Sequence, residues 1–254
     1  MFADAFPPHP ELRTLIAAPA RPARRRFDPQ DFATSRPDLG LDRFLTPVAL
    51  REAARHETLA GHSGDLWVFA YGSLMWDPAF RFAELRRARV SGHARRFILK
   101  DRFGARGTRE RPGLLAALDD GAGCEGLVFR IRAAELGRET EILWRREMAG
   151  PAYRPTFLAA ETAAGRVPAL AFVADPRSPV IQRDISREEQ VSCIATGAGA
   201  FGSSFDYLAN IAAHFAALGI EDAEVQSLLR ETTAFRAALA RSGAGLPEQH
   251  GGAE

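Results

Sequence analysis

The run of residues 66–71, Leu-Trp-Val-Phe-Ala-Tyr, constrains the fold of this chain more than any other stretch of its sequence. Consecutive apolar and aromatic residues without polar alternation are typical of a strand that is buried on both faces. Gly72 and Ser73 follow at once, and this pair indicates a sharp turn of the backbone. The sequence therefore predicts a buried strand that enters a tight loop.

Other strand-like runs cover residues 95–99, 113–118, 126–131 and 168–173, and a strand is expected to begin near Tyr153. Turn signals such as Asp119-Asp120-Gly121 are expected to separate these runs. Residues 133–148 are expected to form a helix with its apolar residues on one side.

The last third of the chain is expected to be helical. Apolar residues recur at helical spacing over residues 207–218, and Gly219 follows as a stop signal. A second apolar stripe spans residues 225–235, and Asp222 before it is a suitable N-cap. Strand-like runs thus come first and helices last, without a βαβ rhythm. We expect an α+β fold built on an antiparallel sheet or barrel.

Residues 1–64 differ in composition from the rest of the chain, because they hold eight of its sixteen prolines. We interpret residues 1–64 as an extension that packs on the domain surface, residues 65–241 as the folded domain and residues 242–254 as a flexible tail. Only residues 48–59 of the extension suit a short helix. The run Arg24-Arg25-Arg26 is expected to be a solvated tail, and contact with an anionic partner is the alternative.

The overall charge and hydropathy exclude several classes of protein. A net charge of +1 argues against nucleic acid or an anionic membrane surface as a partner. No stretch approaches the roughly 20 apolar residues needed to cross a bilayer, and the first ten residues lack the apolar core of a secretory signal. We expect a soluble cytoplasmic protein.

The cysteines and histidines indicate neither a metal site nor a disulfide framework. Cys124 and Cys193 are the only two cysteines, and both are expected to be buried reduced thiols. The six histidines show no metal-binding spacing, and no G-x-G-x-x-G motif follows a strand. We therefore expect no metal and no dinucleotide cofactor.

The loop at Tyr71-Gly72-Ser73-Leu74 is the first candidate site. A buried strand that ends in Gly-Ser can leave successive backbone N–H groups pointing at one spot, and such a nest binds an anion or a developing oxyanion. A plain strand-turn is an equally good interpretation of these residues alone, since the spacing matches neither a phosphate-binding loop nor a nucleophile elbow.

Glu147 is the second candidate. It stands near the end of the predicted helix 133–148, where a carboxylate gains nothing from the helix dipole. Function would explain its position, and so would a surface ion pair with Arg145 or Arg146. Taken alone, the surface pair is the favoured interpretation.

Taken together, these segments resemble the ChaC branch of the γ-glutamylcyclotransferases. The matches occur in family order over residues 66–236, roughly two-thirds of the chain. Ala70 stands where the family often has glycine, and residues 1–64 lie largely outside the resemblance. The matching segments are 68–76 (V-F-x-Y-G-S-L-x-W), 95–97 (R-R-F), 106–113 (R-G-x…P-G), 124–130 (C-x-G-x-x-[YF]-R), 146–153 (R-E-M…Y) and 202–208 (G-x-x-x-x-Y-L).

The resemblance implies a small mixed or antiparallel β-barrel flanked by helices, with the loop at the barrel mouth and a glutamate facing it. By that match Glu147 is the catalytic acid/base. The residues that line the substrate site are then Tyr71, Gly72, Ser73 and Leu74, with Tyr207 as a lesser candidate for a hydroxyl near the glutamyl group.

The family's reaction implies glutathione as the small-molecule substrate. The α-amine of the γ-glutamyl group attacks its own γ-carbonyl, 5-oxoproline forms and Cys-Gly leaves. Such an intramolecular attack needs neither a protein nucleophile nor a cofactor. An arginine is expected near the glycyl carboxylate, and Arg106 is our candidate.

Three alternatives remain open at the level of the sequence. Ser73 could be the nucleophile of a hydrolase or acyltransferase, but no histidine stands at a diagnostic spacing from it. The scaffold could bind a γ-glutamyl compound or a protein partner without catalysis. The chemistry could also be retained for other γ-glutamyl amines or amino acids.

Overall fold

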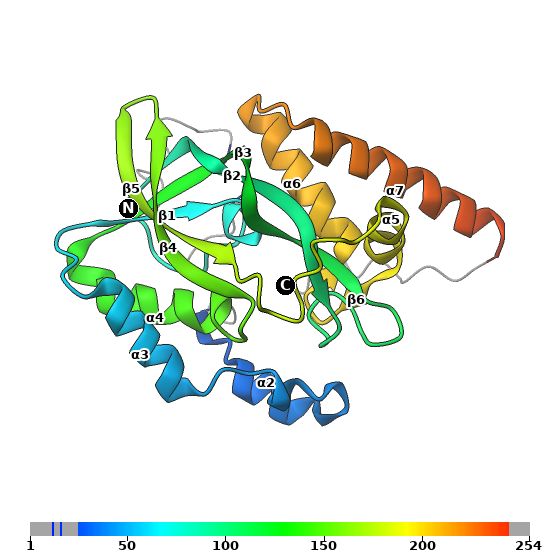
Figure 1. Ribbon diagram of the computed structural model, residues 1–254, viewed down its shortest axis with the longest axis horizontal. Coiled ribbons are helices and arrows are strands. Elements are labelled where there is room, and N and C mark those ends of the chain that lie inside the picture. Colours follow the sequence, from blue (N-terminus) through cyan, green and yellow to red (C-terminus); the bar gives the residue numbers. More distant parts are fainter. Residues whose placement is uncertain (1–11, 13–15, 17–24, 244–254) are drawn as a thin grey trace.

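A computed structural model describes residues 12, 16 and 25–243 of the chain. Its centre is a closed barrel of five strands in the order β1-β3-β2-β4-β5 (Figure 1). The strands are β1 (Leu66–Ala70), β2 (Glu84–Asp101), β3 (Gly113–Ile131), β4 (Tyr153–Thr162) and β5 (Gly165–Ala174). Neighbours pair antiparallel except at the closure, where β1 and part of β3 run parallel to β5. The expected α+β fold with a small mixed barrel is confirmed.

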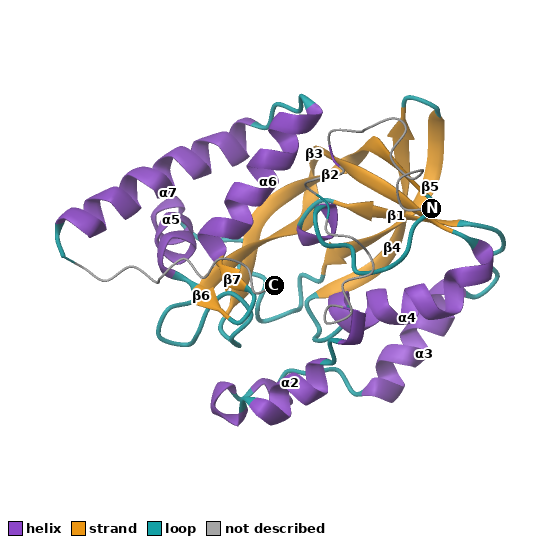
Figure 2. Cartoon of the chain, turned by 180° about the vertical axis from the view of Figure 1, so that it is seen from behind, coloured by secondary structure: helices purple, strands orange, loops and turns teal. Residues whose placement is uncertain are grey.

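Helices cover the barrel on two sides (Figure 2). On one side lie α2 (Pro29–Ser35), α3 (Val48–Leu59) and α4 (Leu136–Glu147), and on the other α5 (Arg187–Thr196), α6 (Ser204–Leu218) and α7 (Ala223–Arg241). Short 3₁₀-helices and a two-residue strand pair connect them: η3 (Pro37–Leu39), η4 (Leu41–Arg43), η5 (Ser73–Met75), η6 (Ala133–Glu135), β6 (Ala198–Gly199) and β7 (Gly202–Ser203). No helix within the described ranges is both long enough and apolar enough to cross a membrane.

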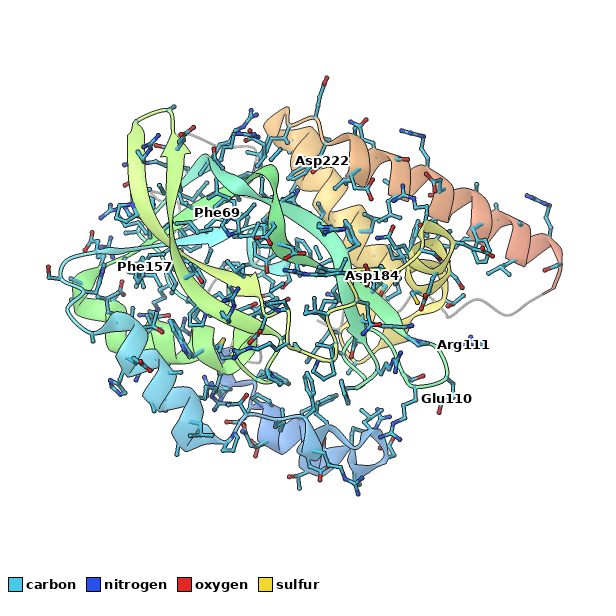
Figure 3. The ribbon with its side chains drawn as sticks, viewed as in Figure 1. Phe69, Glu110, Arg111, Phe157, Asp184 and Asp222 are labelled. Atoms are coloured by element: carbon cyan, nitrogen blue, oxygen red, sulfur yellow. The ribbon has the colours of Figure 1, made fainter. Side chains whose placement is uncertain are left out.

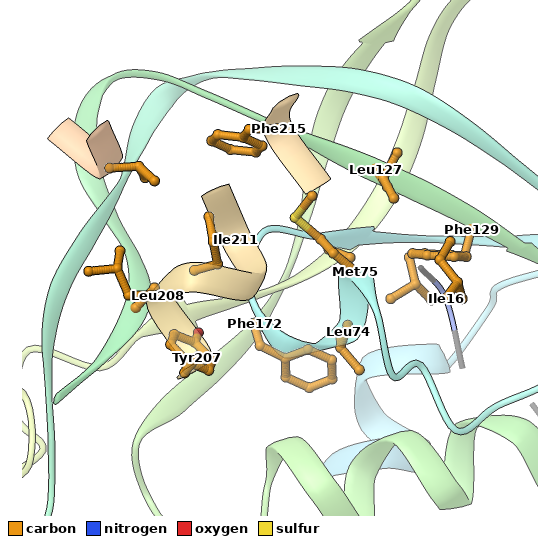
Figure 4. Packing of buried hydrophobic residues seen from close by; sticks show 14 of the residues in the cluster. Ile16, Leu74, Met75, Leu127, Phe129, Phe172, Tyr207, Leu208, Ile211 and Phe215 are labelled. Atoms are coloured by element: carbon orange, nitrogen blue, oxygen red, sulfur yellow. The ribbon is translucent and has the colours of Figure 1, made fainter. Parts of the chain in front are cut away.

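The described residues form three buried hydrophobic clusters, and two of them bear on the loop after β1. One is formed by barrel residues and the loop residue Tyr71, and small side chains such as Ala169 and Ala171 keep it narrow. The larger one joins the strands to α4, α6 and α7, and it includes Trp144. Figure 4 shows Phe172 and Tyr207 among its members. Residues of β1 enter both clusters, since its continuous apolar run is buried on both faces.

The predicted helix boundaries follow from local signals that the structure confirms. The helix at residues 48–59 forms as α3. Gly219 ends α6 in the left-handed conformation with φ of 62°, which glycine adopts without a steric penalty. Asp222 caps α7 by accepting a hydrogen bond from the N–H of Val225 at 3.0 Å. Both cysteines are buried free thiols, as expected.

The turn expected at Asp119-Asp120-Gly121 is wrong, because these residues lie inside the 19-residue strand β3. Between the pairs Ser91–Gly123 and His93–Asp120, β3 carries one residue more than β2, which makes a bulge. Bulges of this kind let a long barrel strand bend. Asp120 and Gly121 are exposed there, whereas Asp119 is buried and pairs with Arg183. The sequence also did not indicate helix α5 or the first half of β2.

The arginine run is not the solvated tail that we expected. Arg24 and the preceding residues, apart from residues 12 and 16, lie outside the described part of the chain. Arg25 forms a two-point ion pair with Glu139 of α4, at 2.7 and 2.8 Å. The side chains of Arg25 and Glu139 are 10% and 2% exposed. Residues 25–47 are therefore docked on the domain. Of the predicted tail 242–254, residues 244–254 also lie outside the description.

Candidate active site

The loop after β1 turns sharply and packs against α6. The hydroxyl of Tyr71 donates a hydrogen bond to the carbonyl oxygen of Phe172 at 2.8 Å. Gly72 approaches Tyr207 so closely that a Cβ atom at position 72 would stand 2.5 Å from Tyr207 Oη. Ser73 then begins η5, and Leu74 packs in the cluster that also holds Phe172 and Tyr207 (Figure 4). Glycine is required at position 72 because of this close approach.

Arg95 of β2 ties the loop to two other elements. Its Nε donates to the carbonyl oxygen of Tyr71 at 2.7 Å, and its Nη2 donates to the carbonyl oxygen of Glu125 on β3 at 2.6 Å. Its Nη1 forms an ion pair at 3.0 Å with Asp222, which is labelled at the start of α7 in Figure 3. The Arg95 side chain is 1% exposed. One buried guanidinium therefore fixes the loop, a barrel strand and a helix start relative to one another.

Glu147 is the last residue of α4, and its side chain faces the loop. The helix is oriented by Trp144, which is fully buried and meets Phe172 edge-on at 5.3 Å between ring centroids. The Glu147 side chain is only 14% exposed, so the interpretation as a surface ion pair is wrong. Arg146 does lie beside it, with Nε 4.0 Å from Glu147 Oε1, and Arg146 also donates to the carbonyl oxygen of Asp77.

The surroundings of Glu147 change its acidity. Burial raises the pKa of the Glu147 carboxyl above its ordinary value, because the apolar site disfavours the ionised form. The Arg146 guanidinium acts against this shift, while the Asp77 carboxylate adds to it. A carboxyl group with a pKa shifted toward neutrality can both accept and return a proton near neutral pH.

All three tyrosines of the chain, Tyr71, Tyr153 and Tyr207, line the same small cavity as Glu147. Burial raises the pKa of Tyr207 to about 12. Burial also raises the pKa of Tyr71 and of Tyr153 well above the ordinary value. The three phenols therefore stay protonated at neutral pH, and the hydroxyl hydrogen of Tyr71 is already donated to Phe172.

The small cavity, of about 30 Å³, opens into a larger one of about 280 Å³. Six of the predicted site residues line the small cavity: Tyr71, Gly72, Ser73, Leu74, Glu147 and Tyr207. Ser73, Glu147, Tyr153 and Tyr207 also line the larger cavity, so the two spaces form one site. The structure thus brings together residues from β1, α4, β4 and α6.

Arg106, the seventh predicted residue, lines only the larger cavity. Its guanidinium lies over the ring of Tyr207 at 5.2 Å and donates to the carbonyl oxygen of Ser203 at 3.1 Å. The buried carboxylate of Asp101 accepts hydrogen bonds from the backbone N–H groups of Phe103 and Arg106, which shapes the loop that carries Arg106. A fixed cation therefore stands beside the larger cavity, next to the small one.

The site has few of the features that a serine nucleophile or a bound metal ion would require. Within the described ranges, no histidine lines either cavity, so Ser73 has no imidazole beside it to act as its base. The buried His214 directs its Nδ1 to the carbonyl oxygen of Asn210 at 2.8 Å. The described part of the chain also holds no group of three or more His, Cys, Asp and Glu side chains that could bind a metal ion.

Sequence reasoning missed two parts of this site. From the sequence, Tyr153 is named only as the end of a motif and not as a site residue. The chain has just three tyrosines, and each of them lies in a different family motif. That distribution is a signal that could have indicated Tyr153 as a site residue. The wall of the larger cavity that is contributed by Phe27, Phe32 and Phe44 had no sequence signal, because residues 1–64 match no motif.

Comparisons with known proteins identify the family of this chain. The model of the family described as "ChaC-like protein" matches residues 66–234. The glutathione-specific gamma-glutamylcyclotransferase of Escherichia coli (strain K12) is 35% identical over 182 residues, which cover 70% of this chain and 78% of that protein. The human glutathione-specific gamma-glutamylcyclotransferase 1 is 31% identical over 152 residues, covering 58% and 68%.

The crystal structure of the yeast γ-glutamylcyclotransferase specific to glutathione has a similar fold. It superposes with a TM-score of 0.63 and 20% identity, and covers 69% of this chain and 99% of that one. At this identity the likeness concerns the barrel and its helices only. The family model spans well over half of the sequence, including the loop after β1 and Glu147. The chain therefore belongs to the ChaC-like family.

Proposed function

We propose that this protein is a γ-glutamylcyclotransferase that converts glutathione to 5-oxoproline and Cys-Gly. The observation that carries the proposal is the position of Glu147, a buried carboxyl of raised pKa that faces the loop after β1 across a narrow cavity. The relatives of similar sequence that bear the name glutathione-specific gamma-glutamylcyclotransferase support glutathione as the substrate.

In this reaction the α-amine nitrogen of the γ-glutamyl group bonds to its own γ-carbonyl carbon. The amide bond to the cysteinyl nitrogen breaks, and that nitrogen leaves as an amine with one more proton. The attacking nitrogen enters as an ammonium group and keeps one of its three protons as the lactam N–H. Of the two protons that it gives up, one passes to the leaving nitrogen and the other to solvent, so the proton count balances without a cofactor. Because attack is intramolecular, the protein needs to hold the glutamyl chain bent and to move protons.

Glu147 suits both proton transfers. In its ionised form it accepts a proton from the α-ammonium group, and in its protonated form it returns one to the departing amine. The narrow cavity and the buried side chain of Glu147 keep this exchange out of bulk water. The hydroxyls of Tyr153 and Tyr207, both in the same cavity, can donate hydrogen bonds to the glutamyl group during these steps.

The loop after β1 supplies hydrogen-bond donors that stabilise the negative charge of the transition state. Ser73 and Leu74 begin the 3₁₀-helix η5, and the first N–H groups of a helical turn have no partner within it. We assign these N–H groups to the oxyanion that develops on the γ-carbonyl oxygen. One well-placed donor of this kind contributes roughly 3–4 kcal/mol to transition-state stabilisation in other enzymes. Arg106, at the larger cavity, is assigned to the glycyl carboxylate of glutathione.

The decisive test is Glu147→Gln, which keeps the shape of the side chain but removes its acid–base function. We expect release of 5-oxoproline from glutathione to fall by at least about 10²-fold, since general acid–base catalysis contributes that much or more. Glu141→Gln is the matched control, because Glu141 is exposed on the same helix. Turnover of glutathione by Glu147→Gln at the wild-type rate would remove Glu147 from the mechanism.

The same assay, run on γ-glutamylalanine and on γ-glutamyl amines, measures specificity. Release of 5-oxoproline from glutathione alone is expected. Release from none of these compounds would overturn the proposal. We also propose a reducing compartment such as the cytoplasm as the location, since both cysteines are buried free thiols.

A further inference from the structure

The larger cavity has a wall that comes from the segment before the barrel. Phe27 and Phe32 pack with Phe201, at ring-centroid distances of 5.1 and 5.8 Å from it. On the same cavity Phe44 stacks on Phe103 at 4.4 Å with an interplanar angle of 18°. All five rings line the cavity and are half-buried. Figure 1 shows α2 below the barrel, with α3, which follows it, lying along α4.

This wall is fixed at both ends. At the start, Arg25 pairs with Glu139 and also donates to the carbonyl oxygen of Ala79 at 2.8 Å, while Arg145 donates to the carbonyl oxygen of Arg25 at 2.7 Å. At the far end, the N–H of Thr46 donates to the carbonyl oxygen of Ala149 at 2.8 Å. The residues between these anchors are therefore held over the space next to Glu147.

The chemistry of the wall does not match the leaving half of glutathione. Cys-Gly is small, and its polar groups are a thiol, an amide and a carboxylate. The carboxylate is assigned to Arg106, which leaves the apolar side of the cavity facing the cysteinyl side chain. Five aromatic rings offer far more apolar surface than a thiol can cover, so an apolar group attached to sulfur would bury surface there.

We propose that the site also cyclises glutathione thioethers that carry an apolar or aromatic substituent on sulfur, and that Phe27, Phe32 and Phe44 determine this specificity. The inference rests on the proposed function. The chemistry is unchanged: the α-amine nitrogen bonds to the γ-carbonyl carbon, and the bond to the cysteinyl nitrogen breaks. A proton passes from the first nitrogen to the second. The products are 5-oxoproline and an S-substituted Cys-Gly, and no oxidant or reductant is needed.

The test compares glutathione, S-methylglutathione and S-hexylglutathione as substrates of the full chain, with 5-oxoproline as the readout. We expect kcat/KM for the hexyl thioether to exceed that for the methyl thioether by about tenfold or more, because several methylene groups become buried. In Phe32→Ala the ratio of hexyl to methyl should fall several-fold. Phe157→Ala is the control, since Phe157 is 40% exposed on β4 and lines neither cavity (Figure 3).

The outcomes separate the two proposals. Turnover of glutathione without turnover of S-hexylglutathione, or a hexyl-to-methyl ratio that Phe32→Ala leaves unchanged, overturns this inference and leaves the proposed function standing. Turnover of no compound overturns both. Calorimetric binding to Glu147→Gln gives a second measurement that does not need catalysis: S-hexylglutathione should bind about tenfold tighter than S-methylglutathione, and equal affinities would contradict the inference.

Discussion

The contact between Gly72 and Tyr207 gives a prediction that can be worked out from two distances. In Gly72→Ala the new Cβ atom stands 2.5 Å from Tyr207 Oη, whereas its distance to Tyr207 Cζ is 3.6 Å. The hydroxyl alone therefore causes the clash. The ring cannot simply swing away, because Trp76 meets it edge-on at 5.3 Å and the Arg106 guanidinium lies over it at 5.2 Å.

The size of the effect follows from the overlap. Relief requires a movement of roughly 1 Å in a packed site, and overpacking of this kind costs about 1–3 kcal/mol. In a Tyr207→Phe background the nearest atom is the ring carbon at 3.6 Å, which is an ordinary contact. The entropy that alanine removes from the unfolded chain is the same in both backgrounds and cancels in a double-mutant cycle. We expect a coupling free energy of about 1–3 kcal/mol between the two substitutions.

Urea unfolding of the four proteins measures this coupling. With an m-value of about 2 kcal/mol/M, Gly72→Ala should lower the midpoint by roughly 1 M in the wild-type background and by little in Tyr207→Phe. Equal losses in the two backgrounds would refute the reasoning, since the hydroxyl would then not be what excludes a side chain at position 72.

Three further predictions concern the groups around the site. Burial raises the pKa of Glu147, so the folded state binds this proton more tightly than the unfolded state, and wild-type stability falls as pH rises from about 4.5 through the raised pKa. Glu147→Gln should therefore raise Tm at pH 8 but not at pH 4, and an equal change at both would contradict this. Arg95→Met should cost about 3–5 kcal/mol by urea unfolding, since Arg95 is 1% exposed and its loss leaves Asp222 and the carbonyl oxygens of Tyr71 and Glu125 without their donor. Arg96→Met should cost less than about 1 kcal/mol, because Arg96 is 44% exposed and its partner Asp119 keeps Arg183. The acid limb of the kcat/KM profile should lie above pH 4.5, because the pKa of Glu147 is raised. In Asp77→Asn this limb should move to lower pH, because the substitution removes a negative charge that raises the pKa of Glu147. A limb that stays in place would contradict the role of Glu147 as the acid/base.

Local signals were sufficient for much of the fold. The apolar run of β1, the Asp222 cap and the stop at Gly219 each act within a few residues, and the structure confirms all three. The error at Asp119-Asp120-Gly121 has a physical origin, because a strand bulge and a turn between strands both favour small and polar residues. A bulge differs from a turn only in that a neighbouring strand pairs with the residues on both sides of it. Here that neighbour is β2, whose paired residues Ser91 and His93 lie well before the bulge in the sequence.

The candidate site also has one part that local sequence signals indicate and one part that they do not. The loop after β1 and Glu147 lie in compact motifs, so a family resemblance could indicate them together. The wall at Phe27, Phe32 and Phe44 depends instead on docking through Arg25 and Glu139, which are separated by 114 positions in the sequence. The sequence around Arg25 and around Glu139 contains nothing that distinguishes these two residues from ordinary charged surface residues.

Helix α4 links the two halves of the site, because it carries Glu139 near one end and Glu147 at the other. Eight residues of helix separate their Cα atoms by about 12 Å along its axis. Release of the segment that begins at Arg25 would leave the Glu139 carboxylate, 2% exposed, without its cation. Removing one partner of a buried pair costs about 3–5 kcal/mol, which keeps the released state below roughly 1% of the population. The aromatic wall is therefore held against α4 in nearly all of the molecules at equilibrium, close to Glu147.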